Sequence, residues 1–235
     1  MRYSIALSAL ALVACSKTAT QAGPDTAASQ TSTEQGALQV PEVGGGGSTQ
    51  SETALRAVVG EPAPDFTLTD LDGKQVKLSS LQGKPVVLEW FNPGCPFVRA
   101  SHTKGSLRDA AKKHPEAVWL AINSAAPGKQ GAGADTNREA ASKYGMTYPI
   151  LLDESGRVGR TYGATNTPHI YVIDERGVLV YRGAIDNSPD GEGESPTDGQ
   201  LVSYVDAALG DLAAKRPIRV AETRAYGCSV KYASK

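Results

Sequence analysis

The chain has 235 residues, 40% of them hydrophobic and 21% charged, with a formal net charge of −1. This near-neutral balance provides no basic field for nucleic acid, and no apolar stretch approaches the length of a membrane span. Three cysteines and three histidines are too few for a disulfide-dense scaffold or a recognisable zinc cluster. We therefore expect one or two domains, no nucleic-acid partner and no bound metal or other cofactor.

Residues 1–15 predict a secretion signal, because one arginine is followed by a short apolar core over residues 5–13. That core is too short for a spanning helix. The signal ends in LVAC at Cys15, which resembles a bacterial lipobox and implies cleavage before Cys15 and a diacylglycerol group on it. The alternative is an ordinary secretory signal with an incidental cysteine. By the same resemblance, Ser16 after the cysteine implies sorting to the outer membrane, on its periplasm-facing side.

Residues 16–55 are rich in Ala, Thr, Ser, Gln and Gly and show no periodic apolar pattern, so this stretch cannot bury a core. We interpret it as a flexible tether of about 40 residues, with an r.m.s. reach on the order of 35 Å. The folded domain is expected over residues 56–215. A C-terminal tail, residues 216–235, follows it and carries Cys228.

The domain begins with two short stretches of alternating polarity, residues 66–69 and 75–78, separated by Asp72-Gly73. This pattern predicts a β-hairpin. Apolar runs and helical spacing then predict six further elements. They are a buried strand at 86–91, a helix from 96 to about 114, strands at 117–122 and 149–153, and helices at 138–144 and 200–215.

A second hairpin is predicted from residues 170–173 and 178–181, across the turn at 174–177. Together with the alternating strands and helices before it, this order predicts an α/β fold. Its central mixed sheet would carry helices on both faces, with the first hairpin added at the N-terminal side.

Cys95 stands at a sharp corner of the predicted fold. It follows the break Asn92-Pro93-Gly94 after a buried strand, and it precedes Pro96, a residue favoured at the first position of a helix. The free N–H groups and the dipole of a helix start favour a thiolate, which is the reactive form of cysteine. We therefore expect an exposed, activated thiol here rather than a buried, inert one.

Five segments together carry a family resemblance. They are Gly60–Phe66, Cys95–Val98 (CPFV), Ile122–Gly131, Thr167–His169 (TPH) and Tyr226–Tyr232 (YGCSVKY). With them the chain resembles the thioredoxin fold, and within it the redoxins of the alkyl hydroperoxide reductase/thiol-specific antioxidant group. It is most similar to the peroxiredoxin-like proteins marked by the CPFV and YGCSVKY segments.

The resemblance implies a role for several residues. Cys95 matches the nucleophilic cysteine of the thioredoxin motif, whereas Val98 replaces its second cysteine. Glu89 stands where thioredoxins carry a buried acid that moves protons, and burial should raise the pKa of such a carboxyl group. Pro168 matches the cis-proline that faces the active sulfur. The residues expected to contact substrate are Pro96, Phe97 and Thr167.

The chain also departs from the peroxiredoxin pattern. Asn92 stands where peroxiredoxins carry Thr or Ser, Leu88 stands in place of their Pro, and Val98 occupies the position of their peroxidatic cysteine. The implied function is therefore thiol-disulfide exchange with protein or small-molecule thiols and disulfides. The alternatives are a divergent thiol peroxidase that acts on peroxides, or a non-catalytic metal- or thiol-binding module that uses Cys95 with His102 and His169.

Cys228 is open to three interpretations. After processing at Cys15, only Cys95 and Cys228 remain as thiols in an oxidising compartment. They could form a structural disulfide, a reversible pair in which Cys228 resolves, or no pair. Pro217 and Gly227 interrupt the tail, so it could fold back to the corner at Cys95.

Overall fold

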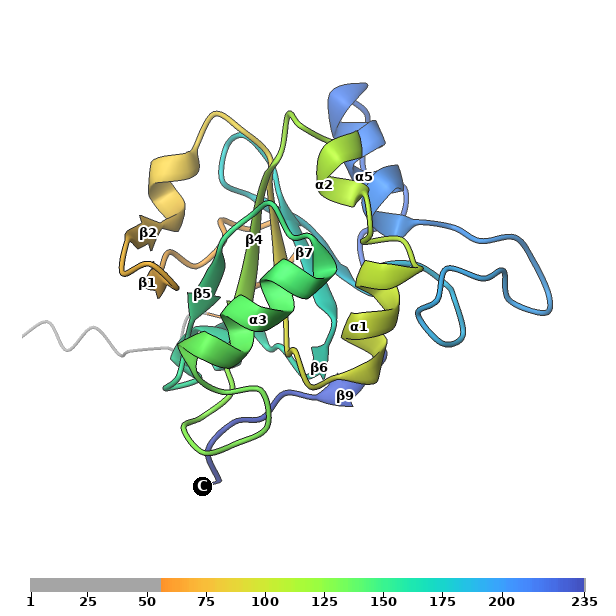
Figure 1. Cartoon of the computed structure of the whole chain (residues 1–235). Helices are drawn as coiled ribbons and strands as arrows, with labels where there is room; N and C mark the ends of the chain where they lie inside the picture. Colours follow the sequence, from red (N-terminus) through yellow and green to blue (C-terminus); the bar gives the residue numbers. More distant parts are fainter. Residues whose placement is uncertain (1–55, 235) are drawn as a thin grey trace, which may run out of the picture. The chain divides into compact units, whose positions relative to one another are not determined.

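A computed structural model describes residues 56–234 of the chain (Figure 1). The predicted signal, the lipidation site Cys15 and the predicted tether lie outside the described residues. In the described part of the chain, no helix combines the length and the apolar character that crossing a membrane requires.

The core of the fold is a seven-stranded mixed sheet in the order β2-β1-β5-β4-β3-β7-β8. Strand β3, in the interior of the sheet, pairs in parallel with β4 and antiparallel with β7. Both predicted hairpins are present, as β1–β2 and β7–β8. The strands are β1 (Thr67–Asp70), β2 (Gln75–Lys77), β3 (Val86–Trp90), β4 (Val118–Asn123), β5 (Ile150–Leu152), β7 (His169–Ile173) and β8 (Leu179–Gly183).

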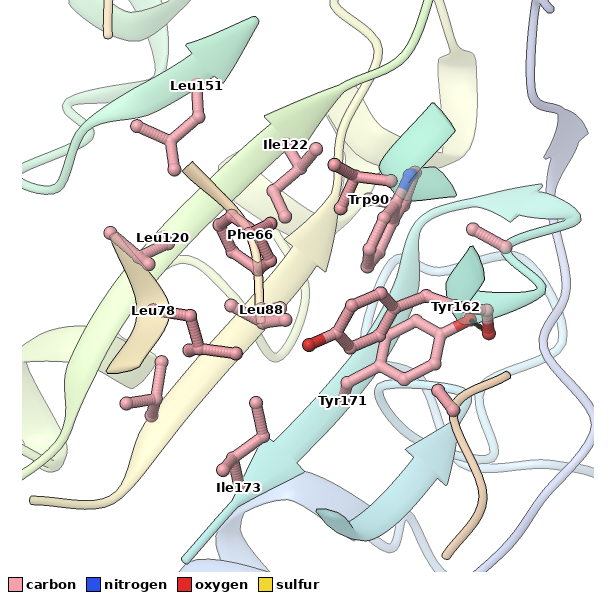
Figure 2. Close-up of a cluster of buried hydrophobic side chains, with 14 of the residues drawn as sticks. Phe66, Leu78, Leu88, Trp90, Leu120, Ile122, Leu151, Tyr162, Tyr171 and Ile173 are labelled. Atoms are coloured by element: carbon pink, nitrogen blue, oxygen red, sulfur yellow. Dashed lines mark hydrogen bonds between the residues drawn. The ribbon is translucent and has the colours of Figure 1, made fainter. Parts of the chain in front are cut away.

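Side chains alternate across β3 and so supply both faces of the sheet. Leu88 and Trp90 join the cluster drawn in Figure 2, where the Trp90 ring lies 5.4 Å from the ring of Tyr162. Val87 and Phe91 belong to the clusters on the opposite face. Helices cover both faces, which confirms the predicted thioredoxin-like α/β fold.

The face that carries Leu88 and Trp90 is covered by α4 and by the N-terminal segment with its 3-10 helix η1. The other face is covered by α1, α2, α3 and α5. The bounds are η1 (Leu78–Leu81), α1 (Pro96–Thr103), α2 (Ala110–Lys113), α3 (Ala134–Tyr144), α4 (Arg157–Tyr162) and α5 (Tyr204–Ala213).

The single helix predicted from residue 96 to about 114 was wrong. It is divided into α1 and α2, because the chain turns at Gly105 against the carbonyl of Gly191, where no side chain would fit. The helix predicted at 200–215 begins only at Tyr204, after Ser203 accepts a hydrogen bond from the Asp206 N–H. Helix α3 begins four residues earlier than residue 138 and ends at Gly145 as predicted.

The sequence patterns missed α4 and a second, two-stranded sheet. In that sheet β6 (Asn166–Thr167) pairs antiparallel with β9 (Cys228–Ser229), so that Thr167 lies opposite Cys228. Figure 1 shows β9 running beside β6, next to the start of α1. The residues predicted as a tail thus pack on the domain as far as Tyr232, while the predicted boundary at 215/216 stays a prediction.

Candidate active site

The corner between β3 and α1 is braced by Asn92. Its side-chain oxygen accepts a hydrogen bond from the Gly94 N–H at 2.8 Å, and its amide nitrogen donates to the Gln130 carbonyl at 2.9 Å. These bonds fix a tight turn that leaves Cys95 as the N-cap residue of α1, with Pro96 in its first turn. The cysteine therefore lies at a helix start, where the sequence places it.

The expectation of an exposed thiol was wrong, because the Cys95 residue is only 1% exposed. The Cys95 Sγ lies 3.0 Å from the Thr167 carbonyl oxygen and donates to it, while the side chain makes no capping bond to the helix. The corner is closed by the two-stranded sheet, since Thr167 of β6 faces Cys95 and Cys228 of β9 packs against the same cluster.

The peptide bond between Thr167 and Pro168 is cis, and Thr167 is buried. The structure thus brings three of the predicted site residues, Cys95, Thr167 and Pro168, to one corner. Of the other predicted contact residues, Pro96 is exposed and Phe97 half-buried. Both line a pocket of about 260 Å³ on the outer side of α1, whose opposite wall includes Asp190 and Glu192.

Cys228 shares this corner, half-buried, and both cysteines are free thiols. Burial first, and then the neighbouring Cys95, raise the pKa of the Cys228 thiol to about 11. At neutral pH Cys228 is therefore a thiol that can donate to the Cys95 sulfur. The tail does fold back to the active corner, as one of the sequence interpretations allowed.

Glu89 is fully buried on β3 and has a partner that the sequence did not reveal. His102 of α1 places its Nε2 2.9 Å from Glu89 Oε1, and the Tyr148 hydroxyl donates to Glu89 Oε2 at 2.9 Å. Burial, followed by the Glu89 charge, raises the pKa of Tyr148 well above its usual range, so its hydroxyl remains a donor. The only sequence signal for this pair is that His102 lies seven residues after Cys95, on a similar face of the helix.

The two histidines considered for a metal site serve other contacts. His102 is engaged by Glu89 and stacks on Tyr144, with ring centroids 5.6 Å apart. The His169 ring stacks on Tyr171 at 4.6 Å, and burial lowers the pKa of His169 to about 4. Within residues 56–234, no group of three or more His, Cys, Asp or Glu side chains is placed to hold a metal ion.

A cysteine at a helix start, facing the residue before a cis-proline, thus lies on a thioredoxin-like fold. The Redoxin family profile matches residues 58–201, and the chain belongs to this family.

Two curated relatives share about a third of their residues with the matched region. Peroxiredoxin Q, chloroplastic, from Triticum aestivum is 32% identical over 133 residues, which cover 52% of this chain and 57% of that protein. Thiol-disulfide oxidoreductase ResA from Geobacillus thermodenitrificans is 32% identical over 121 residues, which cover 51% of this chain and 65% of that protein. The chain thus spans less than two thirds of the length of these relatives.

A solved structure is similar over more of the chain. An uncharacterized conserved protein from Geobacillus kaustophilus has a TM-score of 0.65 and 29% identity, and the match covers 76% of this chain and 94% of that one. This similarity extends the common fold well beyond the region shared with the curated relatives.

Proposed function

We propose that the protein is a thiol-disulfide oxidoreductase in which Cys95 is the nucleophile and Cys228 the resolving thiol. The observation that carries the proposal is that the two free thiols meet at the start of α1. Cys228 packs against the cluster that contains Cys95 and lies opposite Thr167, whose carbonyl accepts from the Cys95 thiol. A thiolate that attacks a disulfide needs a second thiol to release the mixed disulfide. Because Val98 replaces the second cysteine of the motif, that thiol must come from elsewhere, and Cys228 is the other cysteine at this corner.

The other predicted residues take supporting roles. Glu89 exchanges protons with the reacting thiols, in the manner of a buried general acid and base. Pro168 and Thr167 shape the surface that a partner meets, and Pro96 and Phe97 extend this surface along α1. The substrates are protein or small-molecule thiols and disulfides.

The place of action rests on the sequence alone. A lipid group on Cys15 and a tether of about 40 residues would hold the domain at a membrane, facing the periplasm from the outer membrane. Two lipid chains or more anchor a protein stably without a spanning helix.

Activity of single-cysteine variants tests the proposal. Reduction of a disulfide-bonded polypeptide such as insulin by dithiothreitol should be accelerated by the wild-type protein and not by Cys95→Ser. The Cys15→Ser variant is the control, because it removes the proposed lipid attachment site outside the domain and should keep full activity in solution. Full activity of Cys95→Ser would overturn the proposal.

A divergent thiol peroxidase is the second candidate, favoured by the similarity to proteins named peroxiredoxin Q. Against it, the Asn92 side chain is occupied by Gly94 and Gln130 in bracing the corner, at the position where peroxiredoxins use a hydroxyl. Stopped-flow oxidation of Cys95 by hydrogen peroxide separates the two candidates. A rate no higher than that of free cysteine rejects the peroxidase.

A further inference from the structure

The C-terminal segment that carries Cys228 is held at both of its ends by a tyrosine. We call residues 226–232 the strap. At its first end, the Tyr226 hydroxyl donates to Asp186 Oδ1 at 2.7 Å, and the Tyr226 ring lies 6.0 Å from that of Phe97. Asp186 is 1% exposed and also accepts from the Ser106 hydroxyl and the Ser188 N–H. This anchor is therefore a hydrogen bond to a buried carboxylate that is itself fixed in place.

The second end of the strap is anchored on α4 and the residues after it. The Tyr232 hydroxyl donates to the Ala164 carbonyl at 2.8 Å, and the Arg160 guanidinium lies 4.7 Å from the centre of the Tyr232 ring. Next to it, the carbonyl of Lys231 accepts from the Ala126 N–H at 2.9 Å. The strap thus joins the loop after β8 to the loop after β4, across the corner at Cys95.

Between the two anchors the strap runs along β6. The Asn166 side chain donates to the Gly227 carbonyl at 3.0 Å, and the Val230 N–H donates to the Thr165 carbonyl at 3.0 Å. Gly227 has a φ of +103°, and a Cβ there would collide with the Thr167 carbonyl. These contacts fix the backbone on both sides of Cys228, so its thiol has little freedom to move away from Cys95.

We propose that Tyr226 and Tyr232 are positioning residues that hold Cys228 against Cys95 and thereby direct the active thiol to an internal disulfide. The inference rests on the proposed function. Cys95 thiolate attacks a partner disulfide, which gives a mixed disulfide and one partner thiolate. Cys228 then loses its proton and attacks the Cys95 sulfur, which gives the Cys95–Cys228 disulfide and releases the second partner thiolate. Two electrons pass from the cysteine pair to the partner disulfide.

The tyrosine hydroxyls matter because a thiol that is already ordered forms a bond without first losing conformational freedom. Removal of one hydroxyl should lower the equilibrium constant for the internal disulfide. We expect about a tenfold loss in Tyr226→Phe, because its acceptor is a carboxylate, and a loss of roughly three- to fivefold in Tyr232→Phe, whose acceptor is a neutral carbonyl. Both substitutions keep the ring and its packing.

The test equilibrates the full chain with glutathione buffers of graded potential and quantifies the linked Cys95 and Cys228 peptides by mass spectrometry. Tyr204→Phe on α5, outside the strap, is the matched control and should behave as wild type. In a Cys228→Ser background, each strap variant should also raise the rate of Cys95 alkylation by iodoacetamide. A merely structural role of the tyrosines would lower the unfolding midpoint and leave the disulfide equilibrium of the folded protein unchanged, and that result would overturn the inference.

The outcomes also separate this inference from the proposed function. If wild type forms no internal disulfide while Cys95→Ser is inactive, the nucleophilic role of Cys95 stands, and the resolving role of Cys228 fails together with the positioning role. If the equilibrium shifts as expected while Cys95→Ser keeps full activity, the positioning role stands and the proposed function fails.

Discussion

His102 and Glu89 form a buried pair on the side of the sheet that carries α1, with the His102 Nε2 2.9 Å from Glu89 Oε1. Since Tyr148 occupies the other carboxylate oxygen, both oxygens of Glu89 are engaged by hydrogen-bonding side chains. His102 and Tyr148 also line a small surface cleft with Arg108, Lys112 and Tyr144.

The Glu89–His102 pair leads to a first prediction, which concerns the rate of thiol-disulfide exchange. Glu89→Gln keeps the size of the side chain but removes its ability to take and release a proton, so release of the mixed disulfide should slow by about 100-fold. Rapid-quench analysis of the mixed disulfide measures this step. Glu116→Gln, an exposed carboxylate in contact with His114, is the control and should leave the rate unchanged. An unaltered rate in Glu89→Gln would remove the acid from the mechanism.

A second prediction concerns the free energy of unfolding. Glu89→Ala leaves the buried His102 and the half-buried Tyr148 without their acceptor, which should destabilise the fold by about 3–5 kcal/mol. Urea denaturation measures the loss. In a double-mutant cycle with His102→Gln, the two losses should be clearly non-additive because the side chains are in contact. Strict additivity would show that the pair contributes no coupling.

The sequence predicted the corner well because its signals are local. The apolar run of β3, the break at Asn92 and the Cys95-Pro96 pair lie within a few residues of one another, so they identify the strand, the turn and the helix start. The burial of Glu89 followed from its apolar neighbours in the same strand. The cis peptide bond before Pro168 followed from the family resemblance.

The rest of the site depends on contacts between distant residues, which no local pattern encodes. Cys95 is covered by Thr167, 72 positions later, and by a strand of only two residues that is too short to show periodicity. The partner of Glu89 is a histidine 13 positions away on another element. The break between α1 and α2 depends on Gly191, far along the chain, and could not be read from the helical spacing.

Gly227 provides a third prediction. Gly227→Ala introduces a Cβ at φ +103° against the Thr167 carbonyl, which should destabilise the strap locally by roughly 1–3 kcal/mol. Faster hydrogen exchange in residues 226–232 would report the loosened strap. Gly210→Ala on α5 is the control, because a Cβ there meets no atom within 4 Å and alanine favours the helix. If residues 226–232 are equally protected from hydrogen exchange in both variants, the strap tolerates alanine at position 227.

His169 provides a fourth prediction, on pH. The pKa of His169 is lowered from 6.5 to about 4 by burial first and then by the charge of Arg182. Between these values the unfolded chain binds a proton that the folded protein does not, so stability should fall as the pH is lowered from about 6.5 to 4. The full loss is about 3 kcal/mol.

Comparison of variants separates the effect of His169 on the pH dependence of stability from the effect of the carboxylates. Urea denaturation of wild type and His169→Gln at pH 7.5, 6, 5 and 4.5 should show a difference in stability that shrinks or reverses toward low pH. His114→Gln changes a half-buried histidine on another part of the domain and keeps His169. Its stability should therefore still fall with decreasing pH by the amount that His169 contributes in wild type. A parallel pair of curves for wild type and His169→Gln would contradict the assignment.

The most direct test of the account is to locate the bonds formed in a single turnover. Reduced protein is mixed with one equivalent of a disulfide-bonded peptide, quenched with acid and mapped by mass spectrometry. The account predicts a Cys95–Cys228 disulfide in wild type and a stable Cys95–peptide disulfide in Cys228→Ser. A peptide attached to Cys228 instead, or no adduct on Cys95 in the Cys228→Ser variant, would contradict it.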